Sequence, residues 1–358
     1  MKILIDIGHP GHVHYFKNLI TELTKDGHEF LIVARDRDVI IRLLEKLNLP
    51  YINRGKGSNS KIGKLLYMLK ADLQILRVAM KFKPDLFLSF STPYAAQVSS
   101  MLGKPHIALT DTEHEDGILS KFTYPFTEAI LTPKSYLNDL GEKHIKFNNV
   151  IEGLYLHKDY FEPDPDIKKI LGLEKNEEYV VIRFVSWNAH HDVGHAGLDN
   201  KAKSDLIKVL EPRFKIFISS EGDLPNEFVP YKIDISPEKM HDVLAEASLF
   251  IGESATMASE SALLGTQAVY INSLPLMGYL AFEQEAGLLR HFESSNGVVS
   301  YVAQIAENNN VKDEAKEKSR MMQQDFISPT KFLNWFISSY PSSMETLIND
   351  PNYESRFR

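Results

Sequence analysis

Three histidines and two glycines stand within the seven residues Gly8–His14, directly after the apolar run Ile3–Ile7. Apolar residues at helical spacing follow, so this segment is predicted to lie where a strand ends and a helix begins. Ligands of open α/β sheets bind at that edge, and a helix N-terminus there favours anions. We therefore take His12 as a candidate catalytic residue and Gly11 as a candidate ligand-binding residue. A tight turn with solvent-exposed histidines is the alternative.

The stretch Asp111–Gly117 follows the apolar run Ile107–Leu109 and holds four carboxylates and one histidine. Carboxyl groups in different surroundings can act as an acid and base pair, and oxygen ligands also suit hard cations. Asp111 and Glu113 are therefore candidate catalytic residues. A solvated acidic loop is the alternative, because many charge runs simply face water.

A third segment, Gly252–Gly265, follows the apolar run Leu249–Ile251 and is rich in small residues. The backbone amides of a helix that begins here could hold a diphosphate, and Glu260 could accept the hydroxyls of a ribose. The alternative is that the small residues serve close helix–sheet packing and that Glu260 lies on the surface. The candidate binding residues in this half of the chain are Arg183, Ser219, Ser220, Glu221, Ser254, Ala255, Thr256, Met257 and Glu260.

The histidine-rich stretch Arg183–His195 follows the strand predicted over Tyr179–Phe184. His190, His191 and Asp192 suggest zinc, but the stretch lacks the helical His-Glu-x-x-His pattern of zinc enzymes. A loop that reaches into an interdomain cleft is the preferred interpretation. We assign no metal here and take His191 as a candidate catalytic residue.

The segment from Lys56 to Lys83 combines seven lysines and arginines with one acid, Asp72, and a leucine-rich apolar stripe. A basic amphipathic helix can lie on an anionic membrane, so peripheral membrane contact through residues 56–83 is one expectation. The alternative is a helix whose stripe packs in the core and whose basic face is solvated. The stripe consists of Leu65, Leu66, Leu69, Leu73, Leu76 and Met80.

Composition narrows the class of protein. The 358 residues have a formal net charge of −8. Proteins that bind nucleic-acid phosphates usually carry a basic excess, so we expect no nucleic-acid partner. Cysteine is absent, which excludes thiolate chemistry and suits a reducing compartment. Asp6 interrupts the N-terminal apolar run, and no uncharged apolar stretch is long enough to span a bilayer. We expect a cytoplasmic protein, with the inner membrane surface as a further location.

Two series of alternating strands and helices predict the fold class. The first runs from Ile3 to Leu131 and the second from Tyr179 to Ile271. The stretch 148–166 between them contains Pro163 and Pro165 and is predicted to be a hinge. Such alternation is typical of α/β domains with parallel sheets. We predict one Rossmann-like domain over residues 1–155 and another over 156–327, facing a cleft, with a helix over 236–247 in the second.

These segments together resemble the GT-B superfamily of nucleotide-sugar glycosyltransferases and UDP-N-acetylglucosamine 2-epimerases. The pattern Gly8-x-x-Gly11-His12-Val13 is similar to the Gly-Gly-His-Val loop of lipid II-forming transferases, and Ser254–Gly265 looks like their Gly-Ala-x-x-x-Ser-Glu segment. Ser328–Phe336 looks like the C-terminal helix that returns to the first domain, so 328–358 joins that domain. Length and the N-terminal motif also suggest the uncharacterised group called domain of unknown function 354.

The resemblance implies transfer of a sugar from a nucleotide-sugar donor, UDP-linked by analogy, to a glycan, lipid-linked or other acceptor, with no cofactor. It implies that Glu260 binds the ribose and that His12 takes the acceptor's proton or positions the acceptor. A role in polysaccharide biosynthesis fits this reaction. Epimerisation or hydrolysis by Asp111, Glu113 and His191 is the alternative, and a non-catalytic nucleotide-sugar sensor is a third. The stretch Ser89–Pro93 lacks the carboxylate that the epimerases carry there, which favours transfer.

Overall fold

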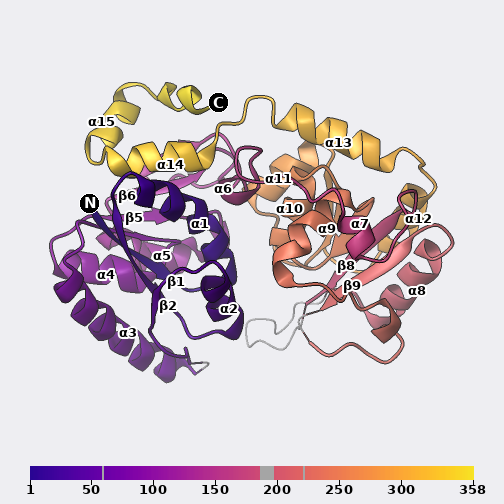
Figure 1. Ribbon diagram of the computed structural model, residues 1–358, viewed down its shortest axis with the longest axis horizontal. Coiled ribbons are helices and arrows are strands. Elements are labelled where there is room, and N and C mark those ends of the chain that lie inside the picture. Colours follow the sequence, from indigo (N-terminus) through magenta and orange to yellow (C-terminus); the bar gives the residue numbers. More distant parts are fainter. Residues whose placement is uncertain (59, 186–196, 221) are drawn as a thin grey trace. The chain divides into compact units, whose positions relative to one another are not determined.

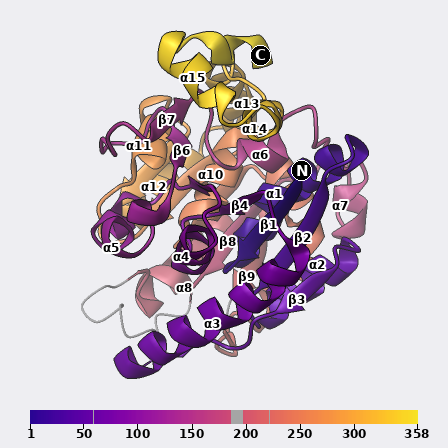
Figure 2. The same ribbon diagram turned by 90° about the vertical axis from the view of Figure 1, so that its left-hand side faces the viewer.

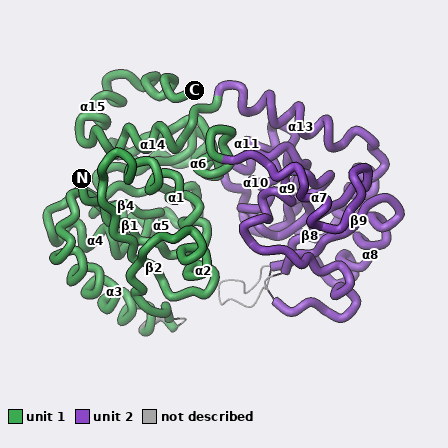
Figure 3. Tube along the Cα trace, viewed as in Figure 1, with its two compact units in different colours: residues 1–160, 326–358 green, residues 161–325 purple. Residues whose placement is uncertain are grey.

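The computed structural model describes residues 1–58, 60–185, 197–220 and 222–358. The chain forms two compact units, unit 1 (Met1–Tyr160 with Phe326–Arg358) and unit 2 (Phe161–Asp325), coloured separately in Figure 3. Each unit contains one parallel sheet with helices on its faces, so the predicted α/β class with two Rossmann-like domains is confirmed.

Unit 1 is built on a seven-stranded sheet in the order β3-β2-β1-β4-β5-β6-β7. Its central strands are mostly apolar because helices cover both faces of the sheet, and Ile3, Leu4 and Ile5 are fully buried. No strand is predicted from the sequence at the β7 position, which lies at the sheet edge. The strands are β1 (Lys2–Ile7), β2 (Glu29–Ala34), β3 (Tyr51–Asn53), β4 (Leu86–Ser89), β5 (His106–Leu109), β6 (Ala129–Pro133) and β7 (His144–Phe147).

Most helices of unit 1 connect these strands, and α14 and α15 form its C-terminal part. In α1 the residues Val13, Phe16, Leu19, Ile20 and Leu23 are buried, which is the one-sided spacing of a helix packed on a sheet. The α-helices are α1 (Pro10–Lys25), α2 (Asp38–Lys46), α3 (Lys61–Phe82), α4 (Pro93–Met101), α5 (Asp116–Phe122), α6 (Gly153–Leu156), α14 (Pro329–Ser338) and α15 (Ser342–Asn349). Short 3₁₀ helices cover Glu113–Glu115, Tyr124–Phe126 and Tyr353–Phe357.

The C-terminal segment returns to unit 1, as predicted. Figure 1 shows α14 in yellow beside α1 in indigo, although the two helices are far apart in sequence. The Thr330 hydroxyl donates to the carbonyl of Leu154 at 2.8 Å, and Asn334 donates to Glu22 on α1. These contacts fix the returning helix on α1 and α6.

Unit 2 has a five-stranded parallel sheet in the order β12-β11-β10-β8-β9. Its core is formed by alternate residues of these strands and by the apolar faces of α8 and α12. The strands are β8 (Tyr179–Phe184), β9 (Lys215–Ser220), β10 (Leu249–Gly252), β11 (Gln267–Ile271) and β12 (Leu289–Phe292). The α-helices are α7 (Ile167–Ile170), α8 (Asn200–Leu210), α9 (Met240–Glu246), α10 (Ala255–Leu263), α11 (Gly278–Glu285), α12 (Val298–Ala306) and α13 (Val311–Met322), and 3₁₀ turns cover Val229–Tyr231 and Pro237–Lys239.

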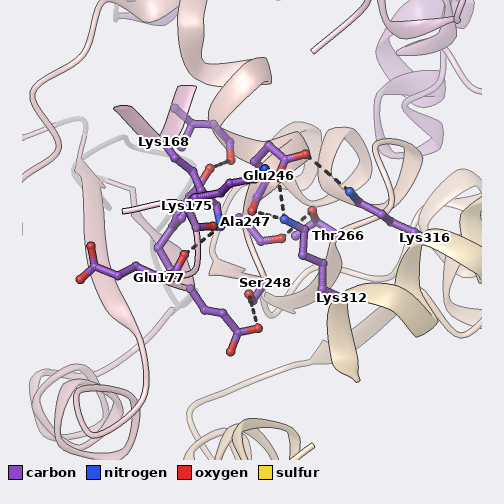
Figure 4. A network of polar contacts seen from close by, with 12 residues as sticks. Lys168, Lys175, Glu177, Glu246, Ala247, Ser248, Thr266, Lys312 and Lys316 are labelled. Atoms are coloured by element: carbon purple, nitrogen blue, oxygen red, sulfur yellow. Dashed lines mark hydrogen bonds and ion pairs between the residues drawn. The ribbon is translucent and has the colours of Figure 1, made fainter. Parts of the chain in front are cut away.

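A polar network ties α9 and α13 together at the edge where β10 and β11 begin (Figure 4). Lys312 donates to the carboxylate of Glu246 at 2.7 Å and to its backbone carbonyl at 2.9 Å. The Thr266 hydroxyl donates to the carbonyl of Leu244 at 2.6 Å, which caps α9. Because ligands bind at the opposite edge of such sheets, we assign this network to stability.

The expectation of a Pro-rich hinge over 148–166 is wrong for its first part. Residues 149–157 are buried, and α6 lies among them, packed on α1 and α14. A division after residue 155 would cut α6, whereas the chain leaves unit 1 after Tyr160. The predicted helix over 236–247 is shorter, because Pro237–Lys239 forms a 3₁₀ turn before α9 begins at Met240.

The long basic helix α3 lies along the lower border of unit 1 in both views (Figure 1, Figure 2). The alternative in which its leucine stripe packs in the core is wrong, because five of the six stripe residues are more than half exposed. Its buried residues include Ala71, Ile75 and Ala79, whose small or branched side chains allow close packing. Within the described residues, no helix has the length and apolar character needed to cross a bilayer.

Candidate functional site

The strand order places the candidate residues at two topological switch points. In unit 1 the chain passes to opposite sides of β1, with β2 on one side and β4 on the other. In unit 2 it passes to opposite sides of β8, with β9 and β10 as neighbours. Open α/β sheets bind ligands at the carboxyl ends of the strands beside such a point. Each unit is described on its own below.

Three residues form a row across the carboxyl edge of the unit 2 sheet. Arg183 on β8 is paired in register with Gly252 on β10 and with Ser219 on β9. A guanidinium N–H of Arg183 donates to the Ser219 hydroxyl at 2.7 Å. A Cβ at Gly252 would lie 2.7 Å from the Cβ of Arg183, so only glycine leaves room for this arrangement.

The nine-residue helix α10 begins next to this row. Its N-cap residue Ser254 accepts the N–H of Met257 at 3.3 Å through its hydroxyl, which satisfies one of the predicted phosphate-binding amides. Ala255 and Thr256 complete the first turn with small side chains. A positive guanidinium and a helix N-terminus thus meet at one strand edge, which is the arrangement that binds anions.

Glu260 has a definite partner that the sequence does not indicate. Its Oε1 lies 3.0 Å from Nε2 of His241 on α9, and both side chains are buried. Glu260 stands six residues after the N-cap Ser254, and it lies on the side of α10 that faces α9 rather than on the surface. The alternative of a surface Glu260 is therefore wrong, and any ribose contact would involve a carboxylate that His241 already orients.

Glu253, directly after β10, connects two distant parts of the backbone. One carboxylate oxygen accepts the N–H of Val185 at 2.8 Å and the other accepts the N–H of Leu198 at 2.7 Å. The side chain is 3% exposed. Glu253 therefore fixes the chain on both sides of residues 186–196 to the end of β10.

A buried carboxyl group lies behind α10. Glu283 on α11 is fully buried and accepts the hydroxyl of Ser259 at 2.6 Å. Burial raises the pKa of Glu283 to about 8, and the Ser259 hydrogen bond opposes that shift. The group is therefore largely protonated near neutral pH.

The remaining predicted site residues of unit 2 are Ser220, Glu221 and His191. The Ser220 hydroxyl accepts the N–H of Gly222 at 3.3 Å, within the turn after β9. Glu221 and His191, together with the rest of the histidine-rich stretch 186–196, lie outside the residues that the structure describes. Within the described part of the chain, no three His, Asp or Glu side chains are grouped as metal ligands would be.

At the switch point of unit 1, His12 is nearly buried in the first turn of α1. Its Nδ1 accepts the N–H of Gly8 at 3.3 Å. Burial, with the nearby His9 and Arg54, holds the pKa of His12 well below its ordinary value. A neutral imidazole that accepts at Nδ1 carries its proton on Nε2, so His12 is arranged to donate a hydrogen bond and not to take a proton.

The other residues of this segment serve the start of α1. The ring of His9 accepts the N–H of Gly11 at 3.2 Å and so caps the helix. A Cβ at Gly11 would lie 3.0 Å from the hydroxyl oxygen of Tyr15, so a larger residue here would require Tyr15 to shift. The alternative of solvent-exposed histidines holds for His9, but it fails for His12 and for the half-buried His14, whose ring centroid lies 5.4 Å from that of Tyr155.

The acidic residues that follow β5 differ in their burial and in their hydrogen-bond partners. Asp111 is 7% exposed at the strand end, and burial together with Glu113 raises its pKa to about 6, although Thr112 donates to it. Glu113 instead accepts the N–H of Leu137 at 3.1 Å. Asp116 accepts the hydroxyls of Tyr124 and Tyr136. Asp111 thus combines a strand-end location with the near-neutral pKa of an acid/base residue.

A buried ion pair supports the same edge of unit 1. Asp6, the last but one residue of β1, accepts from Nε of Arg54 at 2.8 Å and from the Thr92 hydroxyl at 2.5 Å. The Arg54 guanidinium packs on the ring of Tyr94 and donates to the hydroxyl of Tyr67. The sequence signal is a charged residue inside an apolar strand, but its partner is 48 residues away.

With this geometry established, comparison with known proteins gives the family. The family model described as "Protein of unknown function (DUF354)" matches residues 1–327. The chain belongs to the DUF354 family. A relative, the uncharacterized protein MJ0665 of Methanocaldococcus jannaschii, is 26% identical over 313 residues, which are 84% of this chain and 91% of the relative.

Solved structures share the fold of this DUF354 protein. The spinosyn rhamnosyltransferase SpnG, with complexes containing spinosyn aglycone and thymidine diphosphate, matches with a TM-score of 0.61 and 13% identity over 95% of this chain and 99% of SpnG. The UDP-GlcNAc 2-epimerase of Neisseria meningitidis, bound to UDP-GlcNAc, matches with a TM-score of 0.61 and 14% identity over 90% and 99%. The DUF354 protein therefore has a GT-B-like fold, the fold of glycosyltransferases and of 2-epimerases.

Proposed function

We propose that this DUF354 protein is a glycosyltransferase that uses a nucleotide-sugar donor, UDP-linked, bound at the carboxyl edge of the unit 2 sheet. The observation that carries the proposal is the row Gly252–Arg183–Ser219 beside the N-terminus of α10. A diphosphate fits this row, because Arg183 offers guanidinium donors while Ala255 and Thr256 offer backbone amides.

In the proposed reaction an acceptor hydroxyl held by unit 1 attacks the anomeric carbon of the sugar. The new C–O bond forms as the bond between the sugar and the diphosphate breaks, and negative charge collects on the departing diphosphate. Arg183 and the start of α10 stabilise that charge without a metal ion. Asp111 takes the proton of the acceptor hydroxyl, and His12 donates from Nε2 to hold the acceptor.

Glu260 is proposed to accept the ribose hydroxyls, as its resemblance to the glutamate of the GT-B transferases implies. His241 then acts as a positioning residue, because its ring orients the carboxylate at 3.0 Å. Ser219 and Ser220, on the neighbouring strand, are proposed to border the nucleotide. A glycan or lipid-linked acceptor, and a place in polysaccharide biosynthesis, belong to the same proposal.

Donor binding is tested by calorimetry with UDP, TDP and their sugars. Substituting Arg183→Ala removes a charge-assisted contact, so we expect binding to weaken by about 10- to 100-fold. Arg320→Ala is the matched control, because Arg320 is exposed on α13 and pairs with Glu317 within that helix. Equal binding by the wild type and Arg183→Ala would overturn the assignment of the diphosphate site.

The reaction type is tested by incubating the wild-type protein with UDP-GlcNAc in the absence of an acceptor and following the sugar by NMR. Glycosyl transfer predicts an unchanged donor. Rapid formation of the 2-epimer or of free sugar would support the epimerase or hydrolase alternative instead. Tight binding with no turnover of any donor and acceptor pair would indicate a sensor.

A further inference from the structure

Helix α3 has two apolar faces, and only one of them is used inside unit 1. Ala71, Ile75 and Ala79, spaced four residues apart, are fully buried. The second face carries large side chains that are 54–62% exposed. Its members are Leu65, Leu66, Leu69, Leu73 and Met80. We call this set the exposed leucine face.

The leucine face is continuous rather than scattered. Successive helical residues turn by about 100°, so Leu65, Leu69, Leu73 and Met80 fall within a sector of about 80° that points away from the buried residues. At 1.5 Å per residue the face extends for about 22 Å along the helix. Contiguous exposed apolar patches of this kind mark interaction surfaces in folded proteins.

Positive charge borders the leucine face. Lys70, Arg77 and Lys81 are exposed and follow the apolar sector directly on one side. The single acid of the helix, Asp72, is only 6% exposed and points to the other side. Among the side chains of α3 that the structure describes, the exposed ones are therefore apolar or cationic, although the whole chain has a net charge of −8.

A cavity of about 410 Å³ extends this surface toward α5. Leu65 and Met68 line one side, and Ile118 and Phe122, which are 66% and 43% exposed, line the other. Arg35 and Lys64 also line it, and within the described residues the buried Nε of Arg35 has no hydrogen-bond acceptor. The cavity therefore offers an anionic headgroup both apolar walls and two cationic side chains.

We propose that the exposed leucine face of α3, with Ile118 and Phe122, docks on an anionic phospholipid bilayer. The helix would lie in the interface with its leucines among the acyl chains and its cations at the phosphates. A second copy of the chain fits less well, because an antiparallel two-fold contact between the two α3 helices would bring their cations against one another. The proposal does not depend on the nucleotide-sugar reaction.

Co-sedimentation of the full-length protein with liposomes tests the proposal without any nucleotide sugar. We expect binding to phosphatidylcholine vesicles that contain phosphatidylglycerol, weaker binding at high salt, and negligible binding to pure phosphatidylcholine. Leu69→Gln with Leu73→Gln should lower the partition coefficient at least about ten-fold. The matched control is Met321→Gln with Ile348→Gln, two equally exposed apolar residues on α13 and α15.

The contribution of the α3 cations to membrane binding is tested separately by replacing Lys70, Arg77 and Lys81 with glutamate. Replacing Lys104, Lys175 and Lys232 with glutamate is the control, because it changes the net charge by the same amount. Binding should be lost in the first triple variant and kept in the second. Because the leucines are exposed, the substitutions should leave the melting temperature unchanged or raised. Equal binding to neutral and anionic vesicles, wild-type binding by the leucine variant, or a wild-type dimer that this variant converts to a monomer would each overturn the proposal.

Discussion

The carboxylate of Glu260 on α10 lies 3.0 Å from Nε2 of His241 on α9, and both residues are nearly buried. This pair orients the carboxylate that is proposed to receive the ribose hydroxyls. It also means that Glu260→Ala would remove a carboxylate that His241 contacts in a buried place. An isosteric substitution is therefore the sharper test of the ribose site.

For Glu260→Gln we expect weaker binding of UDP by about ten-fold, and unchanged binding of inorganic pyrophosphate, which lacks a ribose. Glutamine keeps an oxygen for His241 but is a poorer acceptor for ribose hydroxyls. Calorimetry with both ligands measures the difference. His241→Gln should give a smaller loss in the same direction, and an equal loss for UDP and pyrophosphate would exclude the ribose assignment.

The parts that are predictable from the sequence are those set by local patterns. The strands β1, β4, β5, β8, β10 and β11 are short, mostly apolar runs, since most of their residues are buried on both faces of a sheet. The edge strands β7 and β12 are not predicted, because half-exposed residues such as His144 and Lys146 or Arg290 and His291 dilute that signal. Turn and N-cap residues locate the starts of α1 and α10 equally well.

The partners within the candidate site are not predictable, because packing between elements decides them. The motif around Glu260 is visible in the sequence, but His241 is 19 residues earlier on another helix. Whether His12 accepts or donates depends on the Gly8 amide, and the Asp6–Arg54 pair depends on the adjacency of β1, β2 and β3. A sequence pattern thus predicts where candidate catalytic and binding residues lie, but not the protonation state or the hydrogen-bond partner of each side chain.

The proton acceptor is tested by the pH dependence of transfer. Burial raises the pKa of Asp111 to about 6, and only the ionised carboxylate can take a proton. Turnover of the wild type should therefore fall as the pH drops below about 6. Asp111→Asn should lower turnover by about 100-fold or more and leave UDP affinity unchanged.

His12 should behave differently, because its Nε2 donates. We expect His12→Gln to lower the apparent affinity for the acceptor while the acid limb of the pH profile stays in place. Steady-state kinetics with varied acceptor concentration measures this. A profile whose acid limb disappears in His12→Gln and persists in Asp111→Asn would reverse the two roles.

The buried carboxyl of Glu283 should make the stability of unit 2 depend on pH. Its pKa is about 8 in the folded protein and about 4.3 in an unfolded chain, so the stability it contributes is fully present below about pH 4. That stability is lost as the pH rises to about 8, by at most about 1.4 kcal/mol per pH unit. The difference in melting temperature between Glu283→Gln and the wild type should grow from pH 5 to pH 8. Calorimetry measures it, with Glu285→Gln, exposed on the same helix, as the control; equal slopes for all three proteins would contradict this assignment.

The Asp6–Arg54 pair should be the most sensitive polar contact of unit 1. Replacing Arg54 with methionine leaves the Asp6 carboxylate buried with only the Thr92 hydroxyl, which typically costs about 3–5 kcal/mol. The double variant Asp6→Asn with Arg54→Met should lose less than the sum of the single variants, because no buried charge remains. Urea unfolding in a Trp187→Phe background measures this, since Trp335 on α14 then reports on unit 1 alone.

Arg42→Met is the matched control, because its ion pair with Asp38 on α2 is exposed and should contribute less than about 1 kcal/mol. Equal effects of Arg54→Met and Arg42→Met would show that the buried pair does not hold the carboxyl edge of β1 in place.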